Sequence, residues 1–250
     1  MKLSQSNLTR LVVTLLVTIA VIVGCWQLGH GLKLFRSGES SIQVTGMAEK
    51  QITSDLIVWN ITVTGYGDTQ AAAFADFKQD VAQMRQYLIA NGIQDSCLST
   101  NSVSITAQSK SVYDPKQERY VELNDGYNVS QNITVSSSNL PVVEKVYQKI
   151  SELYSQGIKF SSAEPLYYYT KLNDLKMELL HNASLNARER ATTIAEGCDA
   201  SVGSLTSTAM GVFQIVGKNS NEDYSWGGAF NTSSKEKVAS ITVRAVYTTK

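Results

Sequence analysis

Residues 56–92 read LIVWNITVTGYGDTQAAAFADFKQDVAQMRQYLIANG, and this stretch decides the fold class. Over 57–63 every second residue is apolar, which is the period of a strand with one buried face. Apolar residues then recur every three or four positions over 74–88, which predicts an amphipathic helix. Asp68 is the expected N-cap of this helix, and Asn91-Gly92 is its expected left-handed end.

The same two periods recur along the rest of the chain. Alternating apolar residues predict further strands at 42–44, 103–107, 127–135, 158–169, 213–215 and 241–247. Helical spacing predicts two more helices, over 141–153 and 172–196. The order is ββαββ-αβ-αββ. We therefore expect one α+β domain over 42–249, with a mostly antiparallel sheet, about three helices packed on it and a single shared interior.

Two long connections interrupt this pattern. A polar connection between the strands at 103–107 and 127–135 contains Asp114-Pro115 and Asn124-Asp125-Gly126, which are turn signals. We expect a hairpin with a long loop there. A second long loop, residues 217–237, joins the last two predicted strands.

An uncharged apolar segment covers residues 11–28, just enough to cross a membrane as a helix. We expect a signal anchor, with residues 1–10 in the cytoplasm, a tether over 29–41, and the domain outside the cytoplasm, in the periplasm or at the cell surface. Two alternatives also export the domain. Residues 22–25 have the residue types of a lipobox, which would make Cys25 a lipidation site, and an ordinary cleaved signal peptide is the other alternative.

The composition excludes several classes of function. Lys plus Arg equals Asp plus Glu at 22 each, so the net charge is zero and we expect no nucleic-acid partner. Two histidines and three scattered cysteines are too few for a metal cluster, and we expect no metal and no cofactor. Cys97 and Cys198 either stay separate thiols or pair as a disulfide in an oxidising compartment.

No catalytic constellation stands out, so we assign no catalytic residue. A nucleophile usually needs a histidine base, and we expect His30 and His181 to lie at the surface. Acids near strand ends could still act as a pair, although scattered acids usually form a solvated surface. These acids are Asp55, Glu122, Asp125, Glu164 and Asp174.

Two groups of aromatic residues are candidates for partner contacts. Residues 167–169 are three tyrosines in a predicted strand, where they serve either core packing or a binding surface. In the 217–237 loop, Tyr224, Trp226 and Phe230 are candidate contacts for a partner subunit or the membrane surface, or they dock on the domain's own core.

Four short stretches carry a resemblance to a known family. They are IQVTG at 42–46 with Asp55 before the Trp59 strand, GYNVS at 126–130, LNDLK at 172–176 with ASLNAR at 183–188, and ITVRA at 241–245. In their order and spacing the chain resembles the SIMPL domain family over about residues 42–249, in its membrane-anchored bacterial branch. Met177 stands where that branch usually has a proline.

The resemblance implies a secreted or periplasmic α+β protein. Some members of the family assemble into ring-like oligomers, some are linked to oxidative-stress defence, and an animal relative binds a signalling kinase. None of these roles comes with an agreed active site, so no site residue is carried over.

Three hypotheses for the function follow. The first is a non-enzymatic cell-envelope module that acts by forming a homo-oligomer or by binding another envelope protein, in envelope or oxidative-stress defence. The second is an acid-dependent hydrolase of unrecognised type. The third is a thiol-based redox-responsive protein that uses Cys97 and Cys198.

Overall fold

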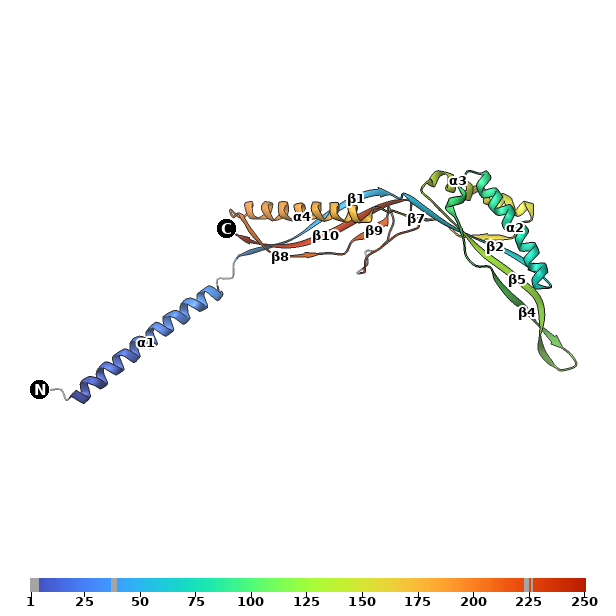
Figure 1. Cartoon of the computed structure of the whole chain (residues 1–250). Coiled ribbons are helices and arrows are strands. Elements are labelled where there is room, and N and C mark those ends of the chain that lie inside the picture. Colours follow the sequence, from blue (N-terminus) through green and yellow to red (C-terminus); the bar gives the residue numbers. More distant parts are fainter. Residues whose placement is uncertain (1–4, 37–39, 223–224, 226) are drawn as a thin grey trace. The chain divides into compact units, whose positions relative to one another are not determined.

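The computed structural model describes residues 5–36, 40–222, 225 and 227–250. Its helices and strands are shown in Figure 1. In chain order they are α1 Gln5–Arg36, β1 Ser41–Thr53, β2 Leu56–Gly67, α2 Gln70–Ala90, η1 Asp95–Cys97, β3 Leu98–Thr100, β4 Ser104–Asp114, β5 Arg119–Ser137, α3 Leu140–Lys149, η2 Ile150–Gln156, β6 Phe160–Ser162, β7 Leu166–Tyr168, α4 Leu172–Glu196, β8 Val202–Met210, β9 Gln214–Gly217 and β10 Glu236–Thr249.

Helix α1 contains the apolar segment predicted to cross a membrane, residues 11–28. Among the residues that the structure describes, no helix is both long enough and apolar enough for a membrane span. Residues 1–4 of the predicted N-terminus and residues 37–39 of the predicted tether lie outside the described residues. The signal anchor therefore stays a prediction.

The strands form two sheets, where the sequence led us to expect one. The first sheet has the order β1-β10-β8, with β9 also paired to β10. The second has the order β3-β5-β2-β6, with β4 on β5 and β7 on β2. The α+β class and the antiparallel pairing are confirmed, because β2 runs antiparallel to β5, β6 and β7 and β9 runs antiparallel to β10.

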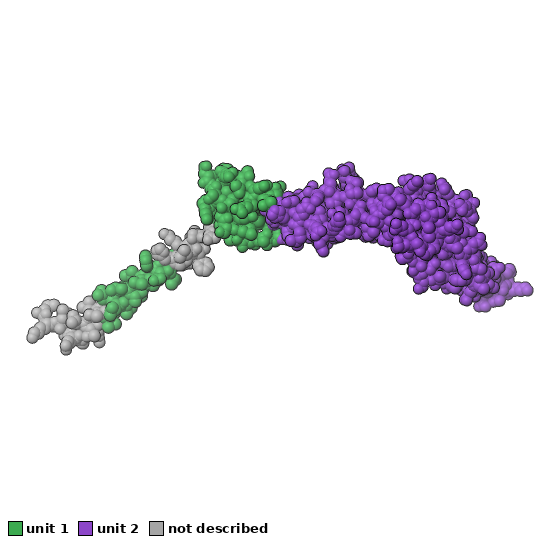
Figure 2. All heavy atoms as spheres, turned by 45° about the horizontal axis from the view of Figure 1, so that its top comes forward, with its two compact units in different colours: residues 1–46, 185–209, 244–250 green, residues 47–184, 210–243 purple. Residues whose placement is uncertain are grey.

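The expectation of one shared interior is wrong. Buried apolar residues fall into three separate clusters, one with residues of the second sheet and two with residues of the first. Strands β1 and β2 enter different sheets although only residues 54–55 separate them. The chain also divides into two compact units: unit 1 comprises residues 1–46, 185–209 and 244–250, and unit 2 comprises residues 47–184 and 210–243 (Figure 2).

The largest cluster lies between the second sheet and the helices α2 and α3. Trp59 of β2 is fully buried there, its Nε1 donates to Oγ of Ser162 at 2.9 Å, and its ring meets that of Tyr147 edge-on at 5.6 Å. Helix α2 comes close because Gly65 has no side chain: a Cβ at residue 65 would lie 2.6 Å from the amide nitrogen of Phe77. All of these residues belong to unit 2.

Helix α4 supplies the other two clusters. In unit 2, Leu175, Leu179 and Ala183 pack against residues of β9 and β10. In unit 1, Ala187 and Ala191 pack against Val44, Ala245 and Tyr247. The alanines at every fourth position, residues 183, 187, 191 and 195, are fully buried.

Two local predictions need correction, and one strand was missed. Thr69, and not Asp68, is the N-cap of α2, because the Thr69 Oγ1 accepts from the Ala72 amide at 3.2 Å. The polar connection expected after residue 107 is mostly strand, since β4 and β5 pair as far as Asp114 and Arg119, with a register shift between Ala107 and Ser109. Strand β8 was not predicted, because its serine- and threonine-rich residues are mostly exposed and show no apolar alternation.

An ion-pair cluster fastens α2 to the segment before β6. Nζ of Lys159 donates to both carboxylate oxygens of Asp76, at 2.9 and 3.0 Å, and lies 3.8 Å from Asp80. Asp76 also accepts from the Tyr66 amide at 3.1 Å. The hydrogen bond from Lys159 lowers the pKa of Asp76, and the same bond raises the pKa of Lys159.

We predict that Asp76→Asn destabilises the protein near neutral pH but not in acid. A lowered pKa in the folded state gives stability that is present above the ordinary carboxyl pKa of about 4 and is lost as the pH falls through the folded value. Because the side chains of both partners are a third to a half exposed, the loss should be only about 0.5 kcal/mol. Urea denaturation from pH 7 to pH 2 measures it. The exposed Asp68→Asn is the matched control, and equal losses at every pH would contradict the prediction.

Candidate interaction surface

The loop between β9 and β10, residues 218–235, holds the aromatic residues predicted to contact a partner. Phe230 is 53% exposed, and its ring centroid lies 6.3 Å from that of Phe213. It therefore rests partly on its own unit while leaving half of its surface open. Tyr224 and Trp226 lie outside the described residues, so their role stays a prediction.

Two buried polar side chains hold this loop. Oε1 of Gln214 accepts from the amides of Ala229, at 2.6 Å, and Ser225, at 3.4 Å, while its Nε2 donates to the Ser225 carbonyl at 2.7 Å. Nζ of Lys237 donates to the Tyr167 carbonyl at 2.9 Å and also to the carbonyl of Asn231. The Gln214 side-chain amide thus binds the loop backbone at Ser225 and Ala229.

Lys237 is only 2% exposed, and burial lowers its pKa, an effect that the charge of Glu222 partly offsets. Its carbonyl partners favour the ammonium form, so we assign it a structural role. Lys237 was not identified from the sequence as a buried residue, although the alternation of β10 indicates it. Residues 239, 241, 243 and 245 of β10 are buried, and residue 237 is in phase with them.

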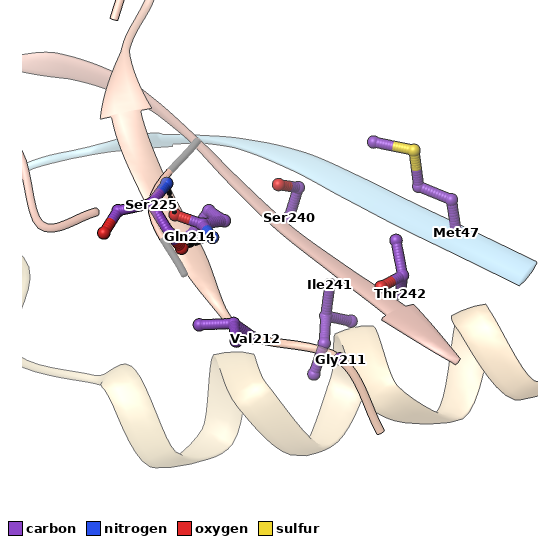
Figure 3. A pocket seen from close by; sticks show the side chains of 8 residues that line it. All are labelled: Met47, Gly211, Val212, Gln214, Ser225, Ser240, Ile241 and Thr242. Atoms are coloured by element: carbon purple, nitrogen blue, oxygen red, sulfur yellow. Dashed lines mark hydrogen bonds between the residues drawn. The ribbon is translucent and has the colours of Figure 1, made fainter. Parts of the chain in front are cut away.

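A groove of about 610 Å³ lies beside the same loop, on the first sheet in unit 2 (Figure 3). In Figure 3 the side chains of Met47 and Ser240 stand on the side of the sheet away from the helix, whereas Ile241 points toward it. Among the described residues that line it, none is titratable: they are Met47, Gly211, Val212, Gln214, Ser225, Ser240, Ile241 and Thr242. This chemistry suits binding of an apolar group and offers no acid or base.

The β4–β5 hairpin of unit 2 carries several exposed apolar residues. Residues 127–137 of β5 pair with β2, but residues 119–124 pair only with β4. In Figure 1 this part of the hairpin runs beyond the end of β2. Every residue of β4 except Asp114 is exposed, so neither face of this strand is covered.

The end of the hairpin carries aromatic and aliphatic side chains. Tyr113 is 50% exposed and Tyr120 is 70% exposed, and their rings meet edge-on with centroids 5.4 Å apart. Val112 and Leu123 are also exposed. An isolated two-stranded ribbon is marginal in water, and an uncovered edge strand is a template for pairing with another chain. This surface can therefore bind protein through both side chains and backbone.

The base of the hairpin is fastened to β2. Nζ of Lys110 lies 2.7 Å from Oδ1 of Asp125, and the Tyr66 hydroxyl donates to the Asp125 carbonyl. The hydrogen bond that Lys110 donates to Asp125 raises the pKa of Lys110. The hairpin is thus held at its base and open at its end.

The acids singled out in the sequence have structural or solvated positions. Asp55 accepts from the amide and hydroxyl of Thr170, at 2.8 and 2.9 Å, and Asp125 pairs with Lys110. Glu122, Glu164 and Asp174 are exposed. Within the described part of the chain no three metal-binding side chains come together.

The remaining candidates are spread over the molecule. Cys25, Cys97 and Cys198 are free thiols, and only Cys97 is partly buried. His181 is exposed on α4. Of the three tyrosines at 167–169, the first packs against the large cluster in unit 2 and the third against the cluster under α4 in the same unit. They serve the core more than a surface.

A family model matches most of the chain. Residues 42–248 match the model of SIMPL, a protein family of unknown function (DUF541). A search of curated proteins found no significant match.

We predict that Lys237→Met destabilises the protein by about 2 kcal/mol, the cost of leaving buried carbonyls without their charged donor. Methionine keeps the apolar stem, so the loss comes from the ammonium alone. Urea denaturation at pH 7 measures it, with Lys218→Met, whose ion pair with Glu236 is exposed and 3.9 Å long, as the control. Equal stability of the two variants would show that the Lys237 contacts contribute nothing.

Proposed function

The chain belongs to the SIMPL family, whose function is unknown, and from this premise we propose that it is a non-enzymatic cell-envelope module. It acts by binding protein, either a second copy of itself or another envelope protein, through the end of the β4–β5 hairpin. The observation that carries the proposal is the combination of an open strand edge with exposed side chains at Val112, Tyr113, Tyr120 and Leu123.

Binding of a partner here is favourable because the side chains at this end of the hairpin are not covered by the rest of the unit. Tyrosine is enriched in interfaces because it brings a large, stiff ring with few rotatable bonds. A partner strand that pairs with β4 would satisfy its outward amides and carbonyls and cover the aromatic face in one step. The structural positions of Asp55 and Asp125 favour this reading over a hydrolase.

The cellular setting is part of the proposal. We place the module at the membrane through residues 11–28, with the folded units outside the cytoplasm. Envelope or oxidative-stress defence is the role in which such a binding module would serve. No observation on Cys97 or Cys198 favours a thiol-based role.

We predict that the purified full-length chain self-associates or retains a partner, and that Tyr113→Ser/Tyr120→Ser abolishes this. The double change removes the two exposed rings without touching a buried residue. Light scattering after size-exclusion chromatography in detergent gives the mass of each complex. Met177→Ser, which removes a side chain that is 68% exposed on α4, is the matched control.

A photo-crosslinking amino acid at residue 120 identifies the partner in cells. The proposal expects crosslinks from residue 120 and none from residue 177. A wild-type chain that is monomeric, and that gives no crosslink from residue 120, would refute it.

We further predict that the N-terminal segment is retained and that Cys25 carries no lipid. Helix α1 continues past Cys25 to Arg36, whereas a lipidated cysteine begins a polar tether. Mass spectrometry of the mature protein should find residues 1–25 in place, and Cys25→Ser should leave the chain in the membrane fraction. A mature chain that starts at a modified Cys25 would establish the lipoprotein alternative.

A further inference from the structure

A second groove, which we call the edge groove, runs between β1 and the C-terminal half of α4. Its volume is about 600 Å³, within the usual range for ligand sites. All its lining residues lie in unit 1 (Figure 2) and come from two elements: Gln43, Val44 and Thr45 from β1, and Asn186, Glu189, Arg190, Thr193 and Ile194 from α4. It is distinct from the hairpin and from the groove in Figure 3.

The strand side of the edge groove is an open sheet edge. Strand β1 is the last strand of the first sheet, with β10 as its only neighbour in the strand order. The Thr249 amide donates to the Ser40 carbonyl at 2.8 Å. Because backbone groups alternate in direction along an antiparallel strand, the amides and carbonyls of Gln43 and Thr45 point away from β10. The groove therefore offers the donors and acceptors that an added strand would use.

Arg190 confirms this direction. Its Nη1 donates to the Thr45 carbonyl at 3.0 Å, so that carbonyl faces α4 and the groove, not β10. Among the described residues, the guanidinium has this one hydrogen bond and no ion pair. Arginine is suited to a carboxylate because its planar fork can donate two parallel hydrogen bonds. In the free protein the Arg190 guanidinium instead donates to the Thr45 carbonyl at the edge of β1.

We propose that the edge groove binds an extended peptide that adds to the edge of β1 and places one carboxylate against Arg190. The amide of the peptide replaces Arg190 at the Thr45 carbonyl, and the released guanidinium pairs with the acidic side chain. Ile194, which is 47% exposed, packs against a neighbouring apolar side chain of the peptide. Glu189 lines the same groove and disfavours a second acidic residue.

Charge decides between this occupant and a second copy of the chain. Two β1 edges paired about a twofold axis through Thr45 would bring the two Arg190 side chains together. Like charges so placed repel. An acidic strand from another protein meets no such conflict, so the complementary charge favours a heterologous peptide.

The test selects binders from a phage-displayed random-peptide library on the full-length chain in detergent. Wild-type protein should enrich sequences with alternating apolar residues and one Asp or Glu. The charge-reversal variant Arg190→Glu should enrich Lys or Arg at the same position. The control Arg188→Glu changes an exposed residue of α4 that lies two positions before Arg190 and outside the groove. It should enrich the same peptide sequences as the wild-type protein.

Fluorescence polarisation with the selected peptide then gives the size of the effect. Arg190→Gln should weaken binding about tenfold, the usual scale of one charge-assisted hydrogen bond. Thr45→Pro, which removes an outward amide that β10 does not use, should abolish binding, while Thr45→Ala should keep it. Circular dichroism confirms that each variant is folded.

Two results would overturn the proposal. One is a library that yields no binder to the wild-type chain. The other is binders whose charge preference is the same for wild type and Arg190→Glu. Retention of peptide binding by Tyr113→Ser/Tyr120→Ser separates this groove from the hairpin, so each proposal can fail alone.

Discussion

The second sheet depends on how closely α2 can approach β2. Gly65 and Gly67 lie against the helix, where added Cβ atoms would come within 2.6 Å of backbone atoms of Phe77 and 2.4 Å of the amide of Ala73. This approach brings Phe77 and Met84 down onto the buried face that carries Trp59. It also places Asp76 where Lys159 can reach it. Close packing, and not a polar network, is thus the first constraint on unit 2.

Two buried polar side chains, those of Gln214 and Lys237, bind backbone groups. Gln214 and Lys237 both bind main-chain groups of the loop between β9 and β10, and Lys237 also binds the carbonyl of Tyr167 in β7. A buried ammonium is costly unless its donors are used, and here carbonyls use them. These two side chains therefore fix the path of the loop backbone at Ser225, Ala229 and Asn231.

Sequence periodicity predicted some elements well and others poorly. Helix α4 begins and ends at the predicted residues, because its leucine and alanine spacing is long and regular. The two sheets could not be predicted, since alternation tells which face of a strand is buried but not which strand lies beside it. For a related reason the sequence predicted a loop between residues 107 and 127, where the structure has the end of the β4–β5 hairpin. The outer part of β4, residues 108–114, is exposed except at Asp114 and shows no apolar alternation, and Asp114-Pro115 marks only the turn that follows. The burial of Lys237 could have been predicted by continuing the alternation of the predicted strand at 241–247 toward lower residue numbers.

The order of the strands also bears on synthesis. Strand β1 is the first strand of the chain, and its sheet neighbour β10 is the last. The ribosome makes about 5–20 residues each second, so β1 waits roughly ten seconds or more for that neighbour. The β4–β5 ribbon, by contrast, closes over a short connection within microseconds of emerging. A nascent or truncated chain thus presents β1 with both of its edges bare.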